Sequence, residues 1–406
     1  MRELLQHARA FESDLVALRR DLHAHPEPSF HEERTAARAA DAVQALGLEV
    51  RRGVGGHGVV AELRNGDGPT VALRADMDAL PIRETNDVPY RSTVDGVMHA
   101  CGHDGHTAML VGAARLLAAA RADGELPAGT VRLLFQPAEE ASDAGGRSGA
   151  VHMIDDGAMA DVIAVFALHV GPHLPAGKVF TREGALMAGS DAFTARVLGR
   201  AAHGARPDAG VDAVVLAAHA VLAAQNAVAR RLSPMESGVL TFGTVRGGTA
   251  EHVIADAVAL DGTLRYFDPD VRRRLRDALE QALAVADAMG GGHELHVRSG
   301  YPPTTNDPAA TRLAEAAARS VLGDDGVWEA APMMGAEDFA LLLAEAPGAL
   351  LWLGAAPDRP RELHQPDMDI DESVLPVGAA VLAACAMAAL GSPPAIPPAS
   401  SRSTTG

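Results

Sequence analysis

Hydrophobic and polar positions along the chain form two kinds of segment. Short runs of mostly apolar residues are typical of buried strands, and longer segments with apolar residues every three or four positions are typical of helices. The short runs predict strands at 71–78, 130–135, 161–168 and 349–353, and the longer segments predict helices at 1–25, 31–46, 107–120, 307–323 and 372–390. Strands and helices that alternate in this way predict an α/β fold, with a mostly parallel sheet and helices on both faces.

A different pattern interrupts this alternation. Between residues 188 and 299 the expected order is strand, helix, strand, strand, helix, strand, at 193–198, 211–230, 239–245, 257–266, 269–289 and 294–298. Asp268 can cap the second helix, Pro269 can open it and Gly290 can end it. The order βαββαβ predicts a ferredoxin-like α+β domain inserted into the α/β fold.

The two patterns divide the 406 residues into parts. We expect one domain built from 1–187 together with 300–390, and an inserted domain at 188–299. Residues 391–406 are rich in Gly, Ser, Pro and Thr, so a disordered tail is predicted there.

Composition excludes some partners and compartments. The net charge of −18 argues against nucleic acid or an anionic membrane as a partner. With only two cysteines, Cys101 and Cys385, a disulfide framework is not expected, and Cys385 lies in an Ala-rich helical run where it would be a small buried hydrophobe. The N-terminus lacks the apolar core of a signal peptide, and no uncharged run reaches membrane-spanning length. These features predict a soluble cytoplasmic protein.

The stretch from Met98 to Thr107 concentrates the reactive side chains, with a thiol and three imidazoles within eight residues. Cys101 and His103 are two positions apart, so in an extended segment both side chains point the same way. A thiolate and an imidazole that converge can hold a divalent metal, whereas the ordinary alternative is a turn that happens to contain Cys and His. Other ligands must decide between these interpretations.

Further candidates follow the predicted strands. Asp76 and Asp78 end the first strand, an acidic pair follows Gln136-Pro137, and His169 follows the third strand. With His364 in a late loop, the candidates at these ends are Cys101, His103, Glu139, Glu140, His169 and His364. Five ligands and a spare carboxylate suit two metals with a general base better than a closed structural zinc site. His23 and His25 could also be ligands, although a structural role in the turn before Pro26 is favoured.

These motifs, in this order, resemble the M20 metallopeptidase clan, in the amidohydrolase branch with hippurate hydrolases, N-acyl-amino-acid amidohydrolases and indole-acetyl-amino-acid hydrolases. The resemblance extends to about residue 390. It rests on Arg20-Asp21-Leu22-His23 with Pro26-Glu27, Arg74-Ala75-Asp76-Met77-Asp78-Ala79-Leu80-Pro81, Met98-His99-Ala100-Cys101-Gly102-His103-Asp104-Gly105-His106, Gln136-Pro137-Ala138-Glu139-Glu140, Leu168-His169, Gly262-Thr263-Leu264-Arg265, Gly335-Ala336-Glu337-Asp338-Phe339 and Leu363-His364.

The resemblance implies roles for the residues of the first domain. It implies two divalent metals per subunit, Zn or Mn with Ni or Co as further candidates, held by Cys101, His103, Glu140, His169 and His364. Cys101 would bridge the metals. Glu139 would be the general base, taking a proton from the attacking water and giving it to the leaving amine. Asp78 would support the site from behind the ligands. Asp76, which stands where other branches place a metal-binding His, would either be structural or, like Asp78, support the site from behind the ligands.

The resemblance also implies roles for the inserted domain, as a lid and as the dimerisation surface of a homodimer or a higher homo-oligomer. His203, in the segment Gly199 to Gly204, would reach a neighbouring active site and polarise the substrate carbonyl. Arg265 would contact the substrate carboxylate. His252 stands where relatives commonly have an Asn that helps hold this carboxylate, and Pro207-Asp208 replaces the usual Pro-His. Both differences bear on the substrate more than on the chemistry.

The resulting functional hypothesis is a metal-dependent hydrolase of the amide bond of N-acyl amino acids, such as hippurate-like or N-acetyl amino acids. A dipeptidase or an aminobenzoyl-glutamate-type amidase is the alternative within the same chemistry. A non-catalytic binding protein on the same fold is the alternative from another class. It is disfavoured because such a protein would ordinarily have lost Glu139 or a ligand, and all are present.

Overall fold

The computed structural model describes residues 2–394, which form two compact units. The first, called the α/β unit here, comprises the chain up to Leu186, Thr305–Ala331 and the residues from Asp338 onward. The second, the inserted unit, comprises Met187–Thr304 and Pro332–Glu337. The sequence pattern placed the insertion at 188–299, and it gave no signal for the second short segment.

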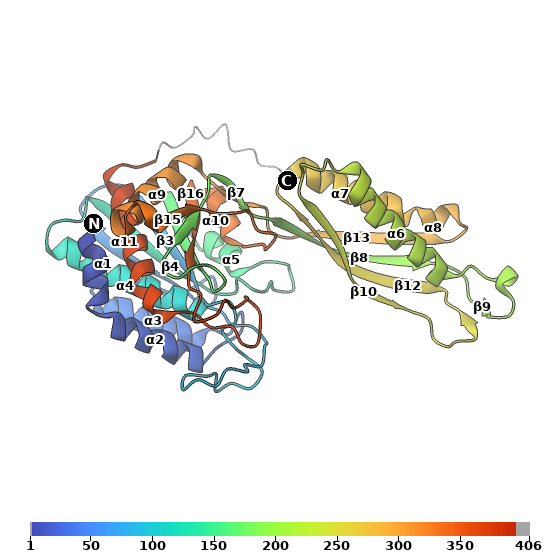
Figure 1. Ribbon diagram of the computed structural model, residues 1–406, viewed down its shortest axis with the longest axis horizontal. Helices are drawn as coiled ribbons and strands as arrows, with labels where there is room; N and C mark the ends of the chain where they lie inside the picture. Colours follow the sequence, from blue (N-terminus) through green and yellow to red (C-terminus); the bar gives the residue numbers. More distant parts are fainter. Residues whose placement is uncertain (1, 395–406) are drawn as a thin grey trace. The chain divides into compact units, whose positions relative to one another are not determined.

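The α/β unit alternates strands with helices in most of its length (Figure 1). Its helices are α1 (Arg2–Arg9), α2 (Glu12–Ala24), α3 (Glu33–Ala45), α4 (His103–Ala122), α5 (Gly149–Asp155), α9 (Pro308–Leu322), α10 (Phe339–Glu345) and α11 (Leu375–Gly391), with 3-10 turns η2 (Asp324–Gly326) and η3 (Glu372–Val374). Its strands are β1 (Glu49–Val54), β2 (Gly58–Asn65), β3 (Thr70–Asp76), β4 (Gly129–Gln136), β5 (Val162–Gly171), β6 (Val179–Thr181), β15 (Val327–Glu329) and β16 (Gly348–Gly354), and a short ribbon pairs β7 (Gly184–Met187) with β14 (Thr304–Asn306).

One sheet organises the α/β unit. Its strand order is β1-β2-β4-β3-β5-β16-β6-β15. The centre, β4-β3-β5-β16, is parallel, whereas β1 and β2 pair antiparallel on one side and β6 runs antiparallel to β16 on the other. This confirms the predicted mainly parallel α/β sheet, with antiparallel additions that the pattern did not predict.

Both faces of the sheet are covered. Odd-numbered side chains of β3, such as Val71 and Leu73, join one hydrophobic core with α4, α9 and α11, while the shorter α5 and α10 lie on the opposite side (Figure 1). Glycines let the two central helices approach closely, because a Cβ at Gly378 would come within 2.0 Å of the sulfur of Met109. Small residues therefore compensate for the low aromatic content in this core.

The inserted unit has a four-stranded antiparallel sheet in the order β10-β12-β8-β13. Its elements are β8 (Gly189–Leu198), β9 (Ala202–His203), η1 (Pro207–Ala209), α6 (Ala213–Arg231), β10 (Gly238–Gly247), β11 (Val253–Ile254), β12 (Ala257–Tyr266), α7 (Pro269–Leu283), α8 (Val285–Ala288) and β13 (Gly292–Ser299). The principal strands and helices follow the predicted βαββαβ order. The small ribbon of β9 and β11 was not predicted.

Two helices, α6 and the segment of η3 with α11, are long and apolar enough to cross a membrane by length and composition alone. The second is 83% buried in its apolar window, in the core of the α/β unit. Helix α6 buries its Ala-rich side against the sheet of the inserted unit. Both helices thus have a place in the packing of a folded unit.

Several predicted boundaries were wrong. The single helix at 1–25 is two helices, because the chain turns at Ala10 and Phe11 between α1 and α2. His103 begins α4, although it was expected in the loop before that helix, and His169 lies within β5, although the strand was expected to end at Leu168. Gly391 ends α11 and does not begin the tail, and residues 395–406 of the predicted tail lie outside the described residues.

Candidate metal centre

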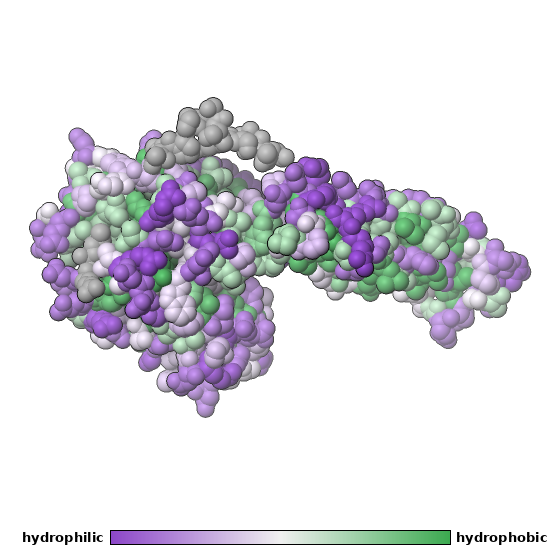
Figure 2. Space-filling view, turned by 45° about the horizontal axis from the view of Figure 1, so that its top comes forward, coloured by the Kyte–Doolittle hydropathy of each residue, from purple (hydrophilic) through white to green (hydrophobic). Residues whose placement is uncertain are grey.

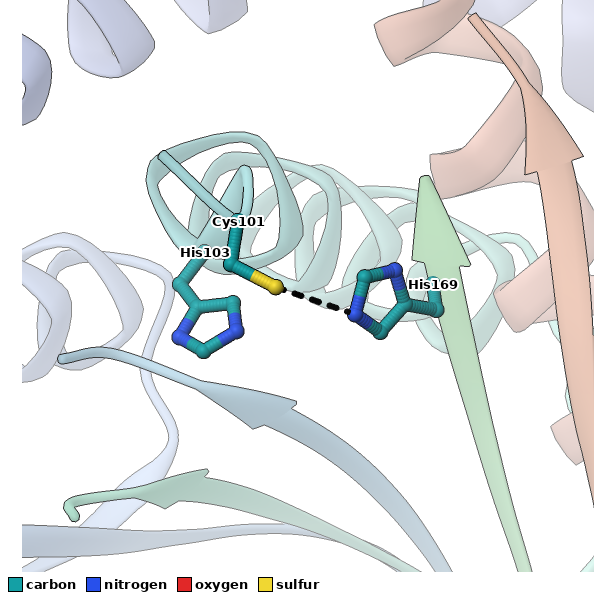
Figure 3. A group of neighbouring side chains, drawn as sticks. All are labelled: Cys101, His103 and His169. Atoms are coloured by element: carbon teal, nitrogen blue, oxygen red, sulfur yellow. Dashed lines mark hydrogen bonds between the residues drawn. The ribbon is translucent and has the colours of Figure 1, made fainter. Parts of the chain in front are cut away.

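The predicted ligands come together at the carboxyl ends of the central strands. Cys101 and His103 flank Gly102, which has a φ of 85° and lies so close to Val170 that a Cβ would come within 2.4 Å of its side chain. Only glycine fits this left-handed, crowded position without strain. Figure 3 shows the side chains of Cys101, His103 and His169 converging on the same space from the start of α4 and from β5.

Two groups of donor atoms share the thiol. The ligand atoms of Cys101, His103 and His169 lie within 4.8 Å of one another, and so do those of Cys101, Glu140 and His364. The Sγ of Cys101 is 3.5 Å from Nε2 of His169, and Nε2 of His364 is 3.1 Å from Oε1 of Glu140. A thiolate can bridge two ions, so one shared sulfur between two groups of three suits a pair of metals.

Two buried atoms in these groups test the fit to a metal. Nε2 of His103 is buried without a hydrogen-bond partner among the described residues, and the buried Oε1 of Glu140 lies 3.9 Å from it and 3.1 Å from Nε2 of His364. Buried polar atoms are normally paired, so the positions of these two atoms suit ligands of a divalent metal. The other nitrogens of the histidines are held from behind, His103 by Asp78 at 3.2 Å and His169 by the carbonyl of Val170 at 2.9 Å. Such support is the usual arrangement for a histidine that binds metal.

The charges around the thiol also favour a cation. Burial, with the carboxylates of Glu140 and Glu139, raises the pKa of Cys101 well above its ordinary value. Burial opposes protonation of His103, yet Asp76 and Asp78 outweigh it and raise its pKa to about 10. Burial and neighbouring His106 lower the pKa of His169. A bound divalent cation would compensate this buried negative charge and favour the thiolate.

Strained backbone marks two positions in the site. His364 has a φ of 61°, its amide donates to the carbonyl of Ala100 at 2.8 Å, and its side chain is half exposed. Ala138 has a φ of 46° immediately before Glu139 and Glu140. Left-handed residues other than glycine cost energy and tend to persist where they serve a site.

Asp76 has other partners. Its carboxylate accepts from Arg74 at 2.6 Å and from Nδ1 of His106 at 2.5 Å, and Nε2 of His106 accepts from the amide of Val170 at 2.9 Å. The ligand atoms of Asp76, His103 and His106 also lie within 4.8 Å of one another. Because both nitrogens of His106 already have partners, this geometry supports a structural role for Asp76. His106 itself, which orients the backbone beside His169, was missed by the sequence reasoning.

Glu139 lies beside the donors. It is buried, its Oε1 accepts from the amide of Asp338 at 3.3 Å, and its ligand atom groups with those of His103 and Glu140. Asp78 accepts from the amide of Glu140 at 3.0 Å in addition to its contact with His103. Asp78 therefore ties the end of β3 to the pair of glutamates.

The N-terminal histidines have structural partners. His23 is fully buried, with Nδ1 2.7 Å from Asp104 and Nε2 3.3 Å from Glu84, in a network that includes buried Arg19. His25 contacts the carbonyl of Asp21 at 2.8 Å and stays in the turn. The sequence gave no sign that Arg19 and Asp104 form a buried ion pair directly behind the ligand segment.

The candidates of the inserted unit are not buried in a network. His203 is exposed, and its Nδ1 accepts from the amide of Ala205 at 3.0 Å, which leaves the proton on Nε2. His252 is exposed beside Glu251, and its backbone carbonyl accepts from the amide of Gly204. The pairing of β9 with β11 thus holds the segments of His203 and His252 together. Arg265 on β12 is partly buried without an ion pair in the described chain, and burial lowers its pKa. The inserted unit contains none of the five predicted metal ligands.

Comparison with known proteins agrees with this geometry. The chain is 38% identical over 368 residues to N-acetyl-L-cysteine deacetylase of Bacillus subtilis, covering 90% of this chain and 85% of the relative. It is 37% identical over 378 residues to IAA-amino acid hydrolase ILR1-like 2 of Arabidopsis thaliana, covering 92% of this chain and 84% of the relative. The solved YXEP protein of Bacillus subtilis, described as a dinuclear metal binding peptidase from the M20 family, superposes with a TM-score of 0.81 at 34% identity, over 94% of this chain and 99% of that one.

The family assignment follows from the extent of these matches. The sequence profile of Peptidase family M20/M25/M40 matches residues 72–388, which is most of the chain and includes all five predicted ligands and Glu139. The fold, the donor groups that fit a divalent metal and the relatives are consistent with one another. The chain belongs to peptidase family M20, and it is a hydrolase that acts on C–N amide bonds.

Proposed function

We propose that the protein is a dinuclear metal-dependent amidohydrolase that releases the amino acid from N-acyl amino acids. The observation that carries the proposal is the sharing of Cys101 between two groups of three donor atoms, with Glu139 beside them. The sharing supports two ions, and the buried carboxylate supplies a base. A single structural metal would require neither.

The proposed ligands are Cys101 as the bridge, with His103, Glu140, His169 and His364. Two divalent ions held there would supply a Lewis acid for the amide carbonyl and acidify the attacking water. The thiolate favours Zn, whereas the carboxylate also suits Mn, and Ni or Co are further candidates. Asp78 holds the imidazole of His103 in place through Nδ1, which leaves Nε2 as the nitrogen that would bind a metal.

Glu139 is the proposed general base. Its carboxylate takes a proton from the attacking water and delivers it to the nitrogen of the leaving amine. The contact from the amide of Asp338 limits the rotation of this side chain. Burial keeps the carboxylate away from bulk water, so its proton goes to the reacting groups.

Substrate recognition is assigned to the inserted unit. Arg265 is partly buried and unpaired in its own unit, which suits a carboxylate of the substrate. His203 carries its proton on an exposed Nε2 and can donate it to a carbonyl oxygen that becomes negative. His252 is proposed as a second donor to the carboxylate. The relatives named for N-acetyl-L-cysteine and for IAA-amino acids support an N-acyl amino acid as the substrate class.

A homodimer is proposed as the active assembly, with His203 acting on substrate in the partner's site. Helix α6 leaves Val214, Val215 and Leu222 exposed, and Leu222 is 68% exposed. Strand β10 is an edge of the sheet and exposes 60% of Val245. Figure 2 shows hydrophobic areas on the surface of the inserted unit. An open edge and apolar side chains are surfaces that pair readily with a second copy.

The direct test is a substrate panel with wild type and Glu139→Gln, both loaded with metal. Wild type should release the amine from N-acetyl and N-benzoyl amino acids, and Glu139→Gln should lose about 10²–10⁴-fold in kcat at unchanged metal content. Preference for dipeptides or aminobenzoyl-glutamate would favour the alternative amidases. Metal binding without turnover on any of these amides would favour a binding protein.

A further inference from the structure

The turn after β4 decides where the two active-site glutamates point. It runs from Pro137 to Glu140, and Ala138 has a φ of 46°, which side chains other than glycine rarely adopt. If Ala138 relaxed to an ordinary conformation, the carboxylate of Glu139, the next residue, would move, whereas Asp78 also holds the amide of Glu140. The contacts that hold Ala138 are therefore part of the site.

Three contacts hold this turn. The amide of Ala138 donates to Oε1 of Glu32 at 2.8 Å, its carbonyl accepts from the amide of Gly149 at 2.9 Å, and the amide of Glu140 donates to Asp78 at 3.0 Å. Gly149 lies so near the turn that a Cβ there would overlap the carbonyl oxygen of Pro137. Two of these contacts come from side chains, those of Glu32 and Asp78. Glu32 is the more distant in sequence, 106 positions from Ala138, and it contacts Ala138 itself.

Glu32 is an unusual residue to find there. It is fully buried, and the same Oε1 also accepts from the amide of Phe30 at 2.9 Å, whose φ is 66°. One carboxylate oxygen thus holds the amides of two left-handed residues. Its other oxygen, Oε2, is buried without a hydrogen-bond partner in the described chain. Burial and the charge of Asp78 raise the pKa of Glu32 to about 7.

The ordinary role for this residue would be to cap helix α3, which begins at the next position. Glu32 makes no side-chain capping bond to that helix. Glu27 does so in its place, with Oε1 accepting from the amide of Arg34 at 2.9 Å and Oε2 from that of Thr35 at 2.7 Å. A fully buried carboxylate that does not serve its own helix needs another reason to be there.

We propose that Glu32 is a positioning residue for catalysis, which fixes the general base Glu139 by holding Ala138 in its left-handed conformation. The proposal rests on the proposed function, because it acts through Glu139. A hydrogen bond to a carboxyl oxygen, whether the carboxyl is neutral or ionised, overlaps in size with the cost of a left-handed alanine, so this contact can hold the turn. A base that moves by about 1 Å can lose roughly 10²-fold in rate.

The experiment compares Glu32→Ala, Glu32→Gln and the matched control Glu27→Ala in the full-length, metal-loaded enzyme. Glu32→Ala should lose about 10–10²-fold in kcat, with KM within about twofold and metal content unchanged. Glu32→Gln should recover most of the rate, because its amide oxygen still accepts both backbone bonds. Glu27→Ala also removes a carboxylate that accepts from two backbone amides, and it should lower thermal stability only. If Glu32→Ala does not fold, Glu32→Asp replaces it, since the shorter side chain withdraws the acceptor and keeps the charge.

A double variant then asks whether the effect passes through the base. In a Glu139→Gln background, Glu32→Ala should change the residual rate by less than about twofold, because residues that act as a unit are not additive. The proposal is overturned by a full additional loss in that background, by loss of metal, by Glu32→Gln as slow as Glu32→Ala, or by Glu32→Ala with normal kcat. A Glu139→Gln single variant with wild-type rate would instead overturn the proposed function, whatever Glu32 does.

Discussion

The two units place their candidate functional side chains in different surroundings. The α/β unit buries ionisable side chains in pairs, such as Arg19 with Asp104 at 2.8 Å and Arg74 with Asp76 at 2.6 Å, directly behind the candidate ligands. In the inserted unit, His203 and His252 are exposed, and partly buried Arg265 has no ion pair among the described residues. Candidate function therefore lies inside one unit and on the surface of the other.

This difference indicates two ways to contribute to one reaction. Buried charges cost desolvation energy, so a network of them is retained where atoms must be held in fixed positions. The α/β unit fits that description, since each predicted ligand histidine except His364 is buried. Under the proposed function, the exposed groups of the inserted unit would act on a ligand outside that unit. The proposed objects of His203 and Arg265 are the substrate and its developing charge.

The largest expected effect is on the buried side of the comparison. Removing metal with a chelator should abolish activity, and adding Zn or Mn should restore it, with two equivalents per subunit by metal quantitation. Cys101→Ser should lower both bound metal and activity, because serine replaces a shared soft ligand. Cys385→Ser is the matched control, since that cysteine is also buried but lies in α11. One tightly bound equivalent that survives Cys101→Ser would remove the dinuclear assignment.

The next effect concerns an exposed group. His203→Ala should lose about 10²–10³-fold in kcat with metal content unchanged, which is typical for loss of one donor to a developing oxyanion. Because the inactive Glu139→Gln protein retains its own His203, mixing the two variants under subunit exchange should restore activity if His203 acts on the partner's site. Proven exchange without recovery would contradict action between subunits, and a fully active His203→Ala would remove the role altogether.

Arg265→Ala should have a smaller effect, and the effect should lie in KM more than in kcat. Loss of a hydrogen bond between charged groups corresponds to about 10–10²-fold in kcat/KM, mostly through KM. Arg265→Lys should recover part of this loss on N-acyl amino acids. Amidating the substrate carboxylate should slow wild type by a similar factor and leave Arg265→Ala unaffected. Equal cleavage of the amide and the acid by wild type would show that Arg265 does not recognise the carboxylate.

Most strands with a clear apolar run were predicted, although the largely buried strand β2 was missed. The buried strands β3, β4, β5 and β16 were predicted because their apolar runs are unbroken. Strand β1 was missed because most of its residues are exposed, and the three-residue strands β6 and β15 are too short to show a pattern. The chain turn at Ala10 and Phe11 carries no Gly or Pro signal.

The residues of the candidate site also differ in how far the sequence could predict them. The predicted ligands could be found because thiol, imidazole and carboxylate groups at strand ends are rare and chemically specific. Glu32 and His106 could not, because their importance lies in which backbone amide they contact, through chain separations that no local pattern reports. The metal roles remain predictions, and the positions that support them are known only from the fold.

The smallest expected effect tests whether a buried charge in the inserted unit behaves like those of the α/β unit. Asp191 is fully buried and accepts from Arg272 at 2.9 Å and from Arg276 at 2.7 Å. Burial alone would raise its pKa, but the hydrogen bonds from the two arginines outweigh burial and lower it. Its ionised form therefore stabilises the fold above the unfolded pKa of about 4, and this contribution is lost as the pH falls through the lower folded pKa.

Asp191→Asn should cost about 1.5–3 kcal/mol of unfolding free energy at pH 7, and the difference from wild type should narrow as the pH falls below about 4. Both tryptophans, Trp328 and Trp352, lie in the α/β unit, so their fluorescence follows that unit while far-UV circular dichroism follows both. In urea, the dichroism transition of Asp191→Asn should move to lower concentration and the fluorescence transition should not. Asp261→Asn, at a partly exposed carboxylate of the same sheet, should move both transitions much less than Asp191→Asn moves the dichroism transition. Equal shifts in both probes would mean that the units unfold together, and the buried pair would then belong to one network rather than to the inserted unit alone.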